Sequence, residues 1–249
     1  MRGAAIFLYG VLCYVVFFLT FLYAIAFVAD VSFVPHTVNR GFATTGLLQA
    51  VVIDAILLGI FAVQHSGMAR SGFKHWLTRW MSPSIERSTY VLLTSAVLIL
   101  LFWQWRALPA LIWDVGQGWA WWLLYALSAL GWLVVLSGTF VINHFDLFGL
   151  RQVWLRARNI AYTPPEFVDS FFYRVVRHPL MLGFIIAFWS IPRMTLGHLL
   201  FAVATTGYTL LAVKFFEERD LLTAHGEDYR RYQQRVPMIC PWPRPGQRP

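Results

Sequence analysis

The sequence predicts an all-α integral membrane protein, a bundle of five to six transmembrane helices that includes a short-armed C-terminal helical hairpin. Hydrophobic residues make up 58% of the 249 residues and charged residues 13%, about half of the charged share that soluble domains usually carry. The apolar residues fall in runs of roughly twenty, the length that a helix needs to cross a bilayer. A buried helix of a large soluble protein does not explain five or six such runs.

Six segments are predicted spans. The first is too long for the apolar region of a cleaved signal peptide, and we interpret it as a retained helix. The fifth contains only residues 180–191 before Pro192, which is too short to cross a bilayer upright. With the sixth span it predicts a helical hairpin that bends at Pro192 and Arg193. The spans are predicted at residues 5–28, 47–67, 89–105, 119–142, 179–191 and 198–216.

The formal net charge of +8 is explained by membrane topology. If the N-terminus is inside, only Arg40, Arg106 and Arg193 lie outside, and all other Lys and Arg residues lie toward the inner side. The positive-inside rule therefore predicts that both termini are cytoplasmic. The implied partner of the chain is the lipid bilayer, and the charge gives no reason to expect nucleic acid. Nothing in the sequence indicates an oligomeric state.

The two cysteines predict neither a disulfide nor a metal site. Cys13 lies inside the first span and Cys240 in the tail, so they are not expected to pair. Two cysteines alone do not form a zinc site.

We expect one membrane domain over residues 1–249, made of a four-span part (1–142), a cytoplasmic lid loop (143–178) and a hairpin with a C-terminal helix (179–237). The loop is long for a compact bundle, and its aromatic residues argue against disorder. We expect it to fold over the cytoplasmic mouth, where it could contain a short hairpin. After the sixth span, Gly226 is predicted to end the helix as a left-handed cap. A short amphipathic helix from Glu227 to about Arg235 then stops at Pro237.

Polar residues from three places in the sequence are predicted to meet at the inner face. Because the two arms form a hairpin, their inner ends are adjacent, and this brings a histidine, two carboxylates and two tyrosines into one small volume. The residues are Arg177, His178, Pro179 and Gly183 at the start of the short arm, Glu217 and Glu218 at the end of the long arm, and Tyr229 and Tyr232 in the segment beyond it.

This constellation suits a zwitterionic nucleoside ligand. Carboxylates can accept hydrogen bonds from ribose hydroxyls or an amino group, and the backbone donors that begin the short arm can bind a carboxylate. Pro179 fits a first helical turn, Gly183 leaves room for a ligand, and tyrosine faces can stack an adenine. The alternative is that Arg177 and His178 are interfacial anchors, that the charged run after Phe216 is a solvated helix extension, and that the tyrosines are ordinary interface aromatics.

The same residues carry a resemblance to a known family. The motifs are, in order, Arg-His-Pro-x-x-x-Gly, a hydrophobic hairpin, Glu-Glu-x-x-Leu, Gly-x-x-Tyr-x-x-Tyr and Val-Pro. Together they resemble the C-terminal signature of isoprenylcysteine carboxyl methyltransferases, and phospholipid methyltransferases share much of this signature. The resemblance covers about 60 residues and implies a site for S-adenosyl-L-methionine, with S-adenosyl-L-homocysteine as its product. It assigns the site to Arg177, His178, Pro179, Leu182, Gly183, Glu217, Glu218, Tyr229 and Tyr232.

A narrower resemblance extends over most of the chain. The segments Gln64 to Arg70, Glu86 to Tyr90 and Asn143 to Gln152 resemble bacterial methanethiol S-methyltransferases and their NnrU-like relatives. The resemblance implies a protein of the bacterial inner membrane that methylates methanethiol to dimethyl sulfide. It is the source of the substrate identity, which composition and spacing do not provide.

Methyl transfer to a thiol needs a proton acceptor, because the thiolate is the nucleophile and a simple thiol has a pKa of about 8.5 or above. We favour His144 or His65 as the base, with Asp146 or Glu86 as the group that orients it. His65 could instead be an interfacial histidine that binds a backbone carbonyl. Two other functions stay open at this point: methylation of isoprenylcysteine or a phospholipid headgroup, and a non-enzymatic accessory role in the membrane.

Overall fold

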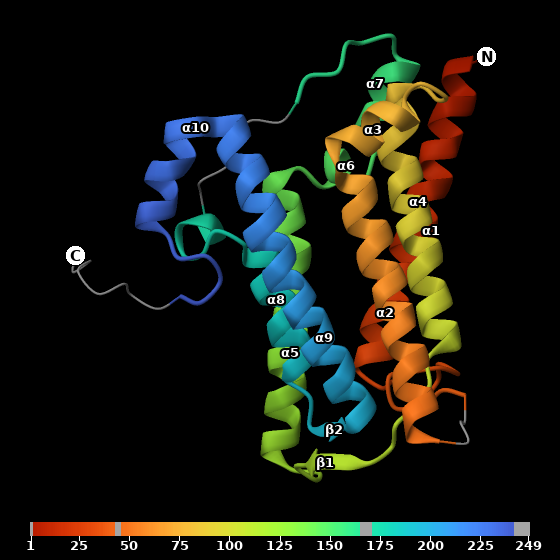
Figure 1. Ribbon diagram of the computed structural model, residues 1–249, viewed down its shortest axis with the longest axis vertical. Helices are drawn as coiled ribbons and strands as arrows, with labels where there is room; N and C mark the ends of the chain where they lie inside the picture. Colours follow the sequence, from red (N-terminus) through yellow and green to blue (C-terminus); the bar gives the residue numbers. More distant parts are fainter. Residues whose placement is uncertain (1, 43–45, 165–170, 242–249) are drawn as a thin grey trace. The chain divides into compact units, whose positions relative to one another are not determined.

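The computed structural model describes residues 2–42, 46–164 and 171–241, and these are largely helical (Figure 1). By the packing of the backbone, the chain divides into two compact units. The first comprises Met1–Trp113, Asn143–Pro165 and Met194–Phe201, and the second comprises Asp114–Ile142, Glu166–Arg193 and Ala202–Pro249. The first three predicted spans fall in the first unit and the fourth, residues 119–142, falls in the second unit.

The first unit is built on the long helix α1 (Arg2–Val28), which packs against α4 (Pro83–Gln104) and α7 (Leu150–Ala157). α2 (Leu47–Ala69) packs on α4, and α3 (Ser71–Leu77) follows it. Glycine permits the close approach of α7 to α1, because a side chain at Gly10 would overlap Val153. The first residues of α9 (Leu196–Ala212) also belong here, where Phe201 packs against the rings of Phe27 and Trp105.

The second unit is built on α5 (Trp119–Ile142) and α8 (Pro179–Trp189), which lie side by side (Figure 1). Two glycines allow this contact, since a side chain at Gly131 would come within 2.6 Å of the Gly183 carbonyl oxygen. The Ser128 hydroxyl adds a hydrogen bond to the carbonyl of Ala187, at 2.9 Å. The rest of α9 continues through the π-helical turn η2 (Val213–Glu217) into α10 (Glu218–Arg235).

Five helices in the described part of the chain are long and apolar enough to cross a membrane, which confirms a multi-pass membrane protein. α8 has only 11 residues, about 17 Å of helix against a hydrocarbon core of about 30 Å. It is the short arm that the sequence predicted. At the bend after it, β2 (Arg193–Thr195) pairs with β1 (Leu111–Asp114) in a two-stranded sheet.

The segment expected to be a lid loop is partly helical. It begins with α6 (His144–Leu147) and α7, and η1 (Phe171–Arg174) follows later. We expected that this segment could contain a short hairpin. Residues 144–157 instead form the two helices α6 and α7, and α7 packs against α1. Residues 165–170 of this segment lie outside the described residues.

The predicted break at Gly226 is confirmed. Gly226 has φ 55° and ψ −124° inside α10, so the helix kinks there and resumes to Arg235. The ψ angle differs from that of a left-handed helical cap, and the conformation is one that glycine adopts readily. The kink turns the last part of α10 back, and Tyr229 and Tyr232 are buried there.

Candidate functional site

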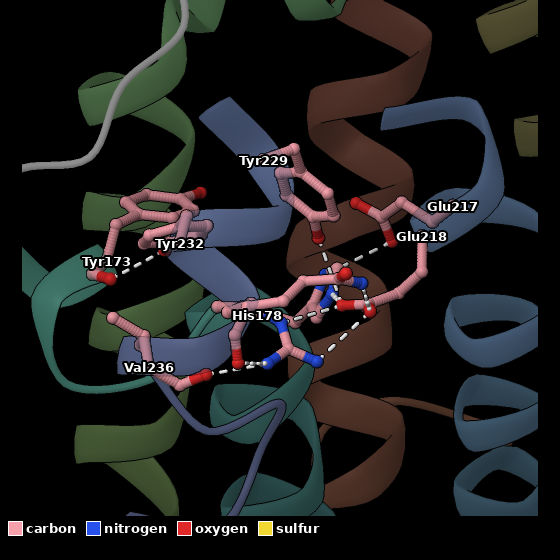
Figure 2. A network of polar contacts seen from close by, with 9 residues as sticks. Tyr173, His178, Glu217, Glu218, Tyr229, Tyr232 and Val236 are labelled. Atoms are coloured by element: carbon pink, nitrogen blue, oxygen red, sulfur yellow. Dashed lines mark hydrogen bonds and ion pairs between the residues drawn. The ribbon is translucent and has the colours of Figure 1, made fainter. Parts of the chain in front are cut away.

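A buried ion pair between Arg177 and Glu218 forms the centre of the candidate site (Figure 2). Arg177 Nε donates to Glu218 Oε1 at 2.8 Å and Nη2 donates to Oε2 at 3.0 Å, the two-pronged geometry that makes arginine–carboxylate pairs strong. The third guanidinium nitrogen, Nη1, donates to the carbonyls of Val236 at 2.6 Å and Gln233 at 3.1 Å. Arg177 thus joins the start of α8 to both ends of α10.

Glu218 receives hydrogen bonds from five donors. Besides the two from Arg177, Oε1 receives one from the Tyr229 hydroxyl at 3.0 Å and pairs with His178 Nε2 at 2.8 Å. Oε2 also accepts from the side-chain amide of Gln233. The carboxylate is only 8% exposed, so a solvated helix extension does not describe this residue. Its oxygens are occupied by the protein itself, and Glu218 therefore acts as the central acceptor of the cluster.

Glu217 has the opposite surroundings, although it is the adjacent residue. Its side chain is 46% exposed, and its carboxylate lies 3.5 Å from Nδ1 of His178. Burial lowers the pKa of His178, but hydrogen bonds to Glu217 and Glu218 and the charges of both carboxylates raise it more, to about 9. His178 is therefore a buried cation between one enclosed and one accessible carboxylate.

The tyrosines of the cluster face inward. Tyr229 is 1% exposed and Tyr232 is 4% exposed, and they pack with Tyr173 and Val236. The Tyr232 hydroxyl donates to the carbonyl of Tyr173 at 2.6 Å (Figure 2). The hydroxyls of Tyr229 and Tyr232 thus anchor both rings inside the cluster, and the stacking of an adenine on these rings stays a prediction.

Gly183 lies in the contact between α8 and α5. A side chain at this position would lie 2.7 Å from the Gly131 carbonyl oxygen and 3.0 Å from the Val135 amide nitrogen. The absence of a side chain thus allows the close approach of α8 to α5, and a role of Gly183 in ligand binding stays a prediction. Pro179 does begin α8, as predicted, and Leu182 lies in its first turn with its amide bonded to the His178 carbonyl.

Two features of the cluster were not predicted from the sequence. Gln233 binds both Arg177 and Glu218, and it belongs to no motif position; only its place on the helix after Gly226 could have indicated it. The backbone amides of Arg177 and His178 donate to the carbonyls of Pro237 and Met238. The π-helical turn before Glu218 is a further local irregularity, of a kind that often marks functional sites.

The predicted catalytic residues lie in the first unit. His144 Nε2 lies 2.8 Å from the Tyr14 hydroxyl, and the ring nitrogens of His65 lie 3.0 and 3.1 Å from the Tyr90 hydroxyl. Asp146 accepts hydrogen bonds from Arg151 at 2.8 Å and from the Tyr162 hydroxyl at 3.1 Å. Glu86 lies in the first turn of α4. The catalytic roles of these four residues stay predictions.

The helical bundle and the buried charged cluster define a multi-pass membrane protein with a candidate ligand site at the start of a short helix. Its sequence matches the family described as NnrU protein over residues 55–240. It is 58% identical to a methanethiol S-methyltransferase of Mycobacterium tuberculosis, over 95% of this chain and 96% of that protein. A second relative, methanethiol S-methyltransferase 1 of Bradyrhizobium diazoefficiens, is 51% identical over 96% of this chain and 82% of its own length.

The chain belongs to the NnrU protein family, and it is an enzyme of the methyltransferase class. The predicted family is therefore confirmed. A more distant relative, the rat protein Nurim, is 29% identical over 75% of this chain and 74% of its own length. No solved structure matches the chain.

Proposed function

We propose that the protein transfers a methyl group from S-adenosyl-L-methionine to a small thiol, with methanethiol as the substrate and dimethyl sulfide and S-adenosyl-L-homocysteine as the products. The observation that supports this most directly is the buried Glu218 cluster beside the exposed carboxylate of Glu217. It occurs in a chain that is 58% identical to a protein named for this reaction. The relatives' names supply the substrate, and the cluster supplies a rigid charged frame for the methyl donor.

The side chains of the cluster fit the methyl donor, which carries an ammonium group, a carboxylate and ribose hydroxyls. Glu217 is half exposed and can accept hydrogen bonds from the ammonium group or the hydroxyls. The first turn of the 11-residue helix α8, from Pro179 to Leu182, presents a helix N-terminus suited to the carboxylate. We therefore assign direct contact to Glu217 and the start of α8. Arg177, Glu218, Tyr229 and Tyr232 hold these groups in place.

When bound, the donor would supply a methyl group already activated by a sulfonium. The protein then has to position the reactants, exclude water and accept the thiol proton. The Glu218 cluster restrains the start of α8 against the end of α10, so Glu217 and the helix terminus stay oriented toward one ligand. A neutral histidine, His144 or His65, would accept the thiol proton.

We further propose that the protein lies in the bacterial inner membrane with both termini and the donor site on the cytoplasmic side. The asymmetry of Lys and Arg supports this orientation. The carboxyl end of α9 and the amino end of α8 both adjoin the charged cluster, so the site lies at the end of its helices that this rule assigns to the cytoplasm.

Calorimetry of S-adenosyl-L-homocysteine with the purified protein in detergent tests the donor site. We expect a dissociation constant on the order of micromolar, which corresponds to about −8 kcal/mol. Glu217→Gln should weaken binding at least about tenfold, the loss of one charged hydrogen bond. Glu227→Gln is the matched control, because that carboxylate is 71% exposed and pairs with Arg230 of the same helix. A folded wild type that does not bind would contradict the proposal.

Headspace detection of dimethyl sulfide tests the acceptor. Wild-type protein with methanethiol and the methyl donor should produce the sulfide. Isoprenylcysteine and phosphatidylethanolamine, supplied separately with labelled donor, test the alternative acceptors. Transfer to either of these without transfer to methanethiol would replace the proposed substrate.

A further inference from the structure

The hydroxyl of Tyr173, in the second unit, is a buried polar group without a hydrogen-bond partner among the described residues. Tyr173 belongs to η1 and is only 9% exposed. Its ring packs with those of Tyr229 and Tyr232, whose own hydroxyls both donate hydrogen bonds within the cluster (Figure 2). Burying a hydroxyl without a partner costs free energy, and such groups are uncommon in folded proteins. A bound ligand is one source of the missing partner.

The backbone that carries Tyr173 is fixed by hydrogen bonds. The Tyr232 hydroxyl donates to the Tyr173 carbonyl at 2.6 Å, and the amide of Val175 donates to the carbonyl of Phe172 at 3.0 Å. In Figure 2 the Tyr173 hydroxyl points away from this backbone, toward the part of the cluster that holds Tyr229. The apolar side chains that pack against the cluster include those of Leu180, Leu221 and Leu222.

The carboxylate of Glu217 is near enough to act on this hydroxyl through its charge. Burial, and then the negative charge of Glu217, raise the pKa of Tyr173, so the phenol keeps its proton and can donate it to a hydrogen bond. The Glu217 side chain is 46% exposed, and its carboxylate lies 3.5 Å from Nδ1 of His178. An enclosed donor and an accessible acceptor therefore occur together in one unit of the chain.

The polar groups of the methyl donor differ in how well they suit this pair of side chains. Its carboxylate accepts hydrogen bonds, but the negative charge of Glu217 would repel it. Its ammonium group can donate to Glu217, but it offers no acceptor for the phenol proton of Tyr173. A ribose hydroxyl both accepts and donates, so a single hydroxyl can accept from Tyr173 and donate to Glu217. The edge of the adenine also carries a donor and acceptors, and it is the competing group.

We propose that Tyr173 binds the ribose of the methyl donor, and that its hydroxyl donates to a ribose hydroxyl which in turn donates to Glu217. This inference rests on the proposed function and deepens it, because it assigns Glu217 to the ribose and not to the ammonium group. The phenol hydroxyl then gains its partner when the nucleoside binds. Tyr173 contributes to the affinity for the ligand, whereas Tyr232 contributes to the fold.

The test compares wild type, Tyr173→Phe and Tyr23→Phe, each as the full-length protein in detergent. Tyr23 lies on α1, where its hydroxyl donates to the His36 carbonyl at 2.9 Å. In calorimetry, Tyr173→Phe should weaken the binding of S-adenosyl-L-homocysteine about fivefold, the contribution of one neutral hydrogen bond, and Tyr23→Phe should bind as wild type does. The Tm without ligand should fall in Tyr23→Phe, which loses a satisfied hydrogen bond, but not in Tyr173→Phe.

Three analogues of S-adenosyl-L-homocysteine identify the group that Tyr173 contacts: the 2′-deoxy form, the 3′-deoxy form and the form with inosine in place of adenosine. The difference in affinity between wild type and Tyr173→Phe should disappear with one of the deoxy forms and persist with the inosine form. A difference that persists with both deoxy forms, or that disappears with the inosine form alone, would overturn the assignment to the ribose.

Two further outcomes would overturn the inference as a whole. Equal affinity of wild type and Tyr173→Phe for S-adenosyl-L-homocysteine would show that the ligand does not meet the hydroxyl. A lower Tm of Tyr173→Phe without ligand, or its failure to fold, would show that the hydroxyl has a partner in the protein itself. A folded wild type that does not bind S-adenosyl-L-homocysteine would instead overturn the proposed function.

Discussion

Glu217 and Glu218 are adjacent residues with opposite environments. Glu218 is enclosed by Arg177, His178, Tyr229 and Gln233, whereas Glu217 is half exposed. At the scale of single residues, the cluster thus separates a carboxylate that holds the fold from one that can meet a ligand. A sequence motif containing two glutamates does not distinguish these roles.

Replacing Glu218 should destabilise the protein far more than replacing Glu217. Glu218→Gln leaves the buried Arg177 without an anionic partner, which costs about 3–5 kcal/mol and lowers Tm by roughly 6–20 °C in a protein of this size. Glu217→Gln should change stability by no more than about 0.5 kcal/mol. Thermal unfolding in detergent, followed by tryptophan fluorescence, measures both. Equal shifts in Tm would show that the two carboxylates are not differently buried.

His178 makes stability depend on pH in the alkaline range. Its pKa is raised to about 9, above the ordinary value of 6.5. The stabilisation is therefore fully present below pH 6.5 and is lost as pH rises through 9, and by linkage it amounts to about 3 kcal/mol. We expect the Tm of wild type to fall between pH 7 and 9.5, and that of His178→Gln to fall much less. Parallel curves would contradict the assignment.

At the scale of elements, the contact of α5 with α8 determines where the short helix lies. Two glycines face each other in this contact, and the Ser128 hydroxyl bonds the carbonyl of Ala187. α8 is too short to cross the bilayer and rests along a full-length helix. Its first turn, which carries Pro179, is thereby held where Arg177 and His178 meet Glu218.

A methyl group at Gly183 should disturb this contact. In Gly183→Ala the new carbon would lie 2.7 Å from a backbone oxygen of α5, so the helices must separate. Overpacking of this kind costs about 1–3 kcal/mol. Gly207→Ala is the matched control, since nothing lies within 4 Å of that position on α9, and it should change stability by about 0.5 kcal/mol or less. Thermal unfolding distinguishes them; a Gly183→Ala protein as stable as Gly207→Ala would contradict the described packing.

At the scale of the whole molecule, five helices of the described residues are long and apolar enough to cross a membrane, and α8 is too short to do so. In the second unit, the charged cluster lies where α8 and α10 begin. The asymmetry of Lys and Arg along the sequence assigns this end of α8 to the cytoplasm in our proposal.

Labelling with a membrane-impermeant maleimide tests the proposed orientation in cells. Cys240 is exposed and Cys13 is buried, so wild type should react at Cys240 only after the membrane is permeabilised. Phe33 is 83% exposed in the loop after α1. A protein with both Phe33→Cys and Cys240→Ser should therefore react in intact cells. The reverse pattern would invert the topology and place the donor site outside.

The sequence by itself determined the elements. Runs of apolar residues predicted the long helices to within a few residues, because crossing a bilayer demands a length and a composition that can be read locally. The helix α4 begins at Pro83 and so extends beyond the apolar run that predicted a span at residues 89–105. Pro179 and Gly226 marked a helix start and a kink, because these residues restrict or release the backbone wherever they occur.

Tertiary structure alone decided how the side chains are used. Glu218 became an internal acceptor, the tyrosines turned inward and Gly183 became a packing position, because burial depends on neighbours far away in the sequence. The pairing of His144 with Tyr14 joins residues 130 positions apart, and no local pattern signals it. Local chemistry fixes what each segment can form, whereas long-range packing fixes which polar atoms remain available for a ligand.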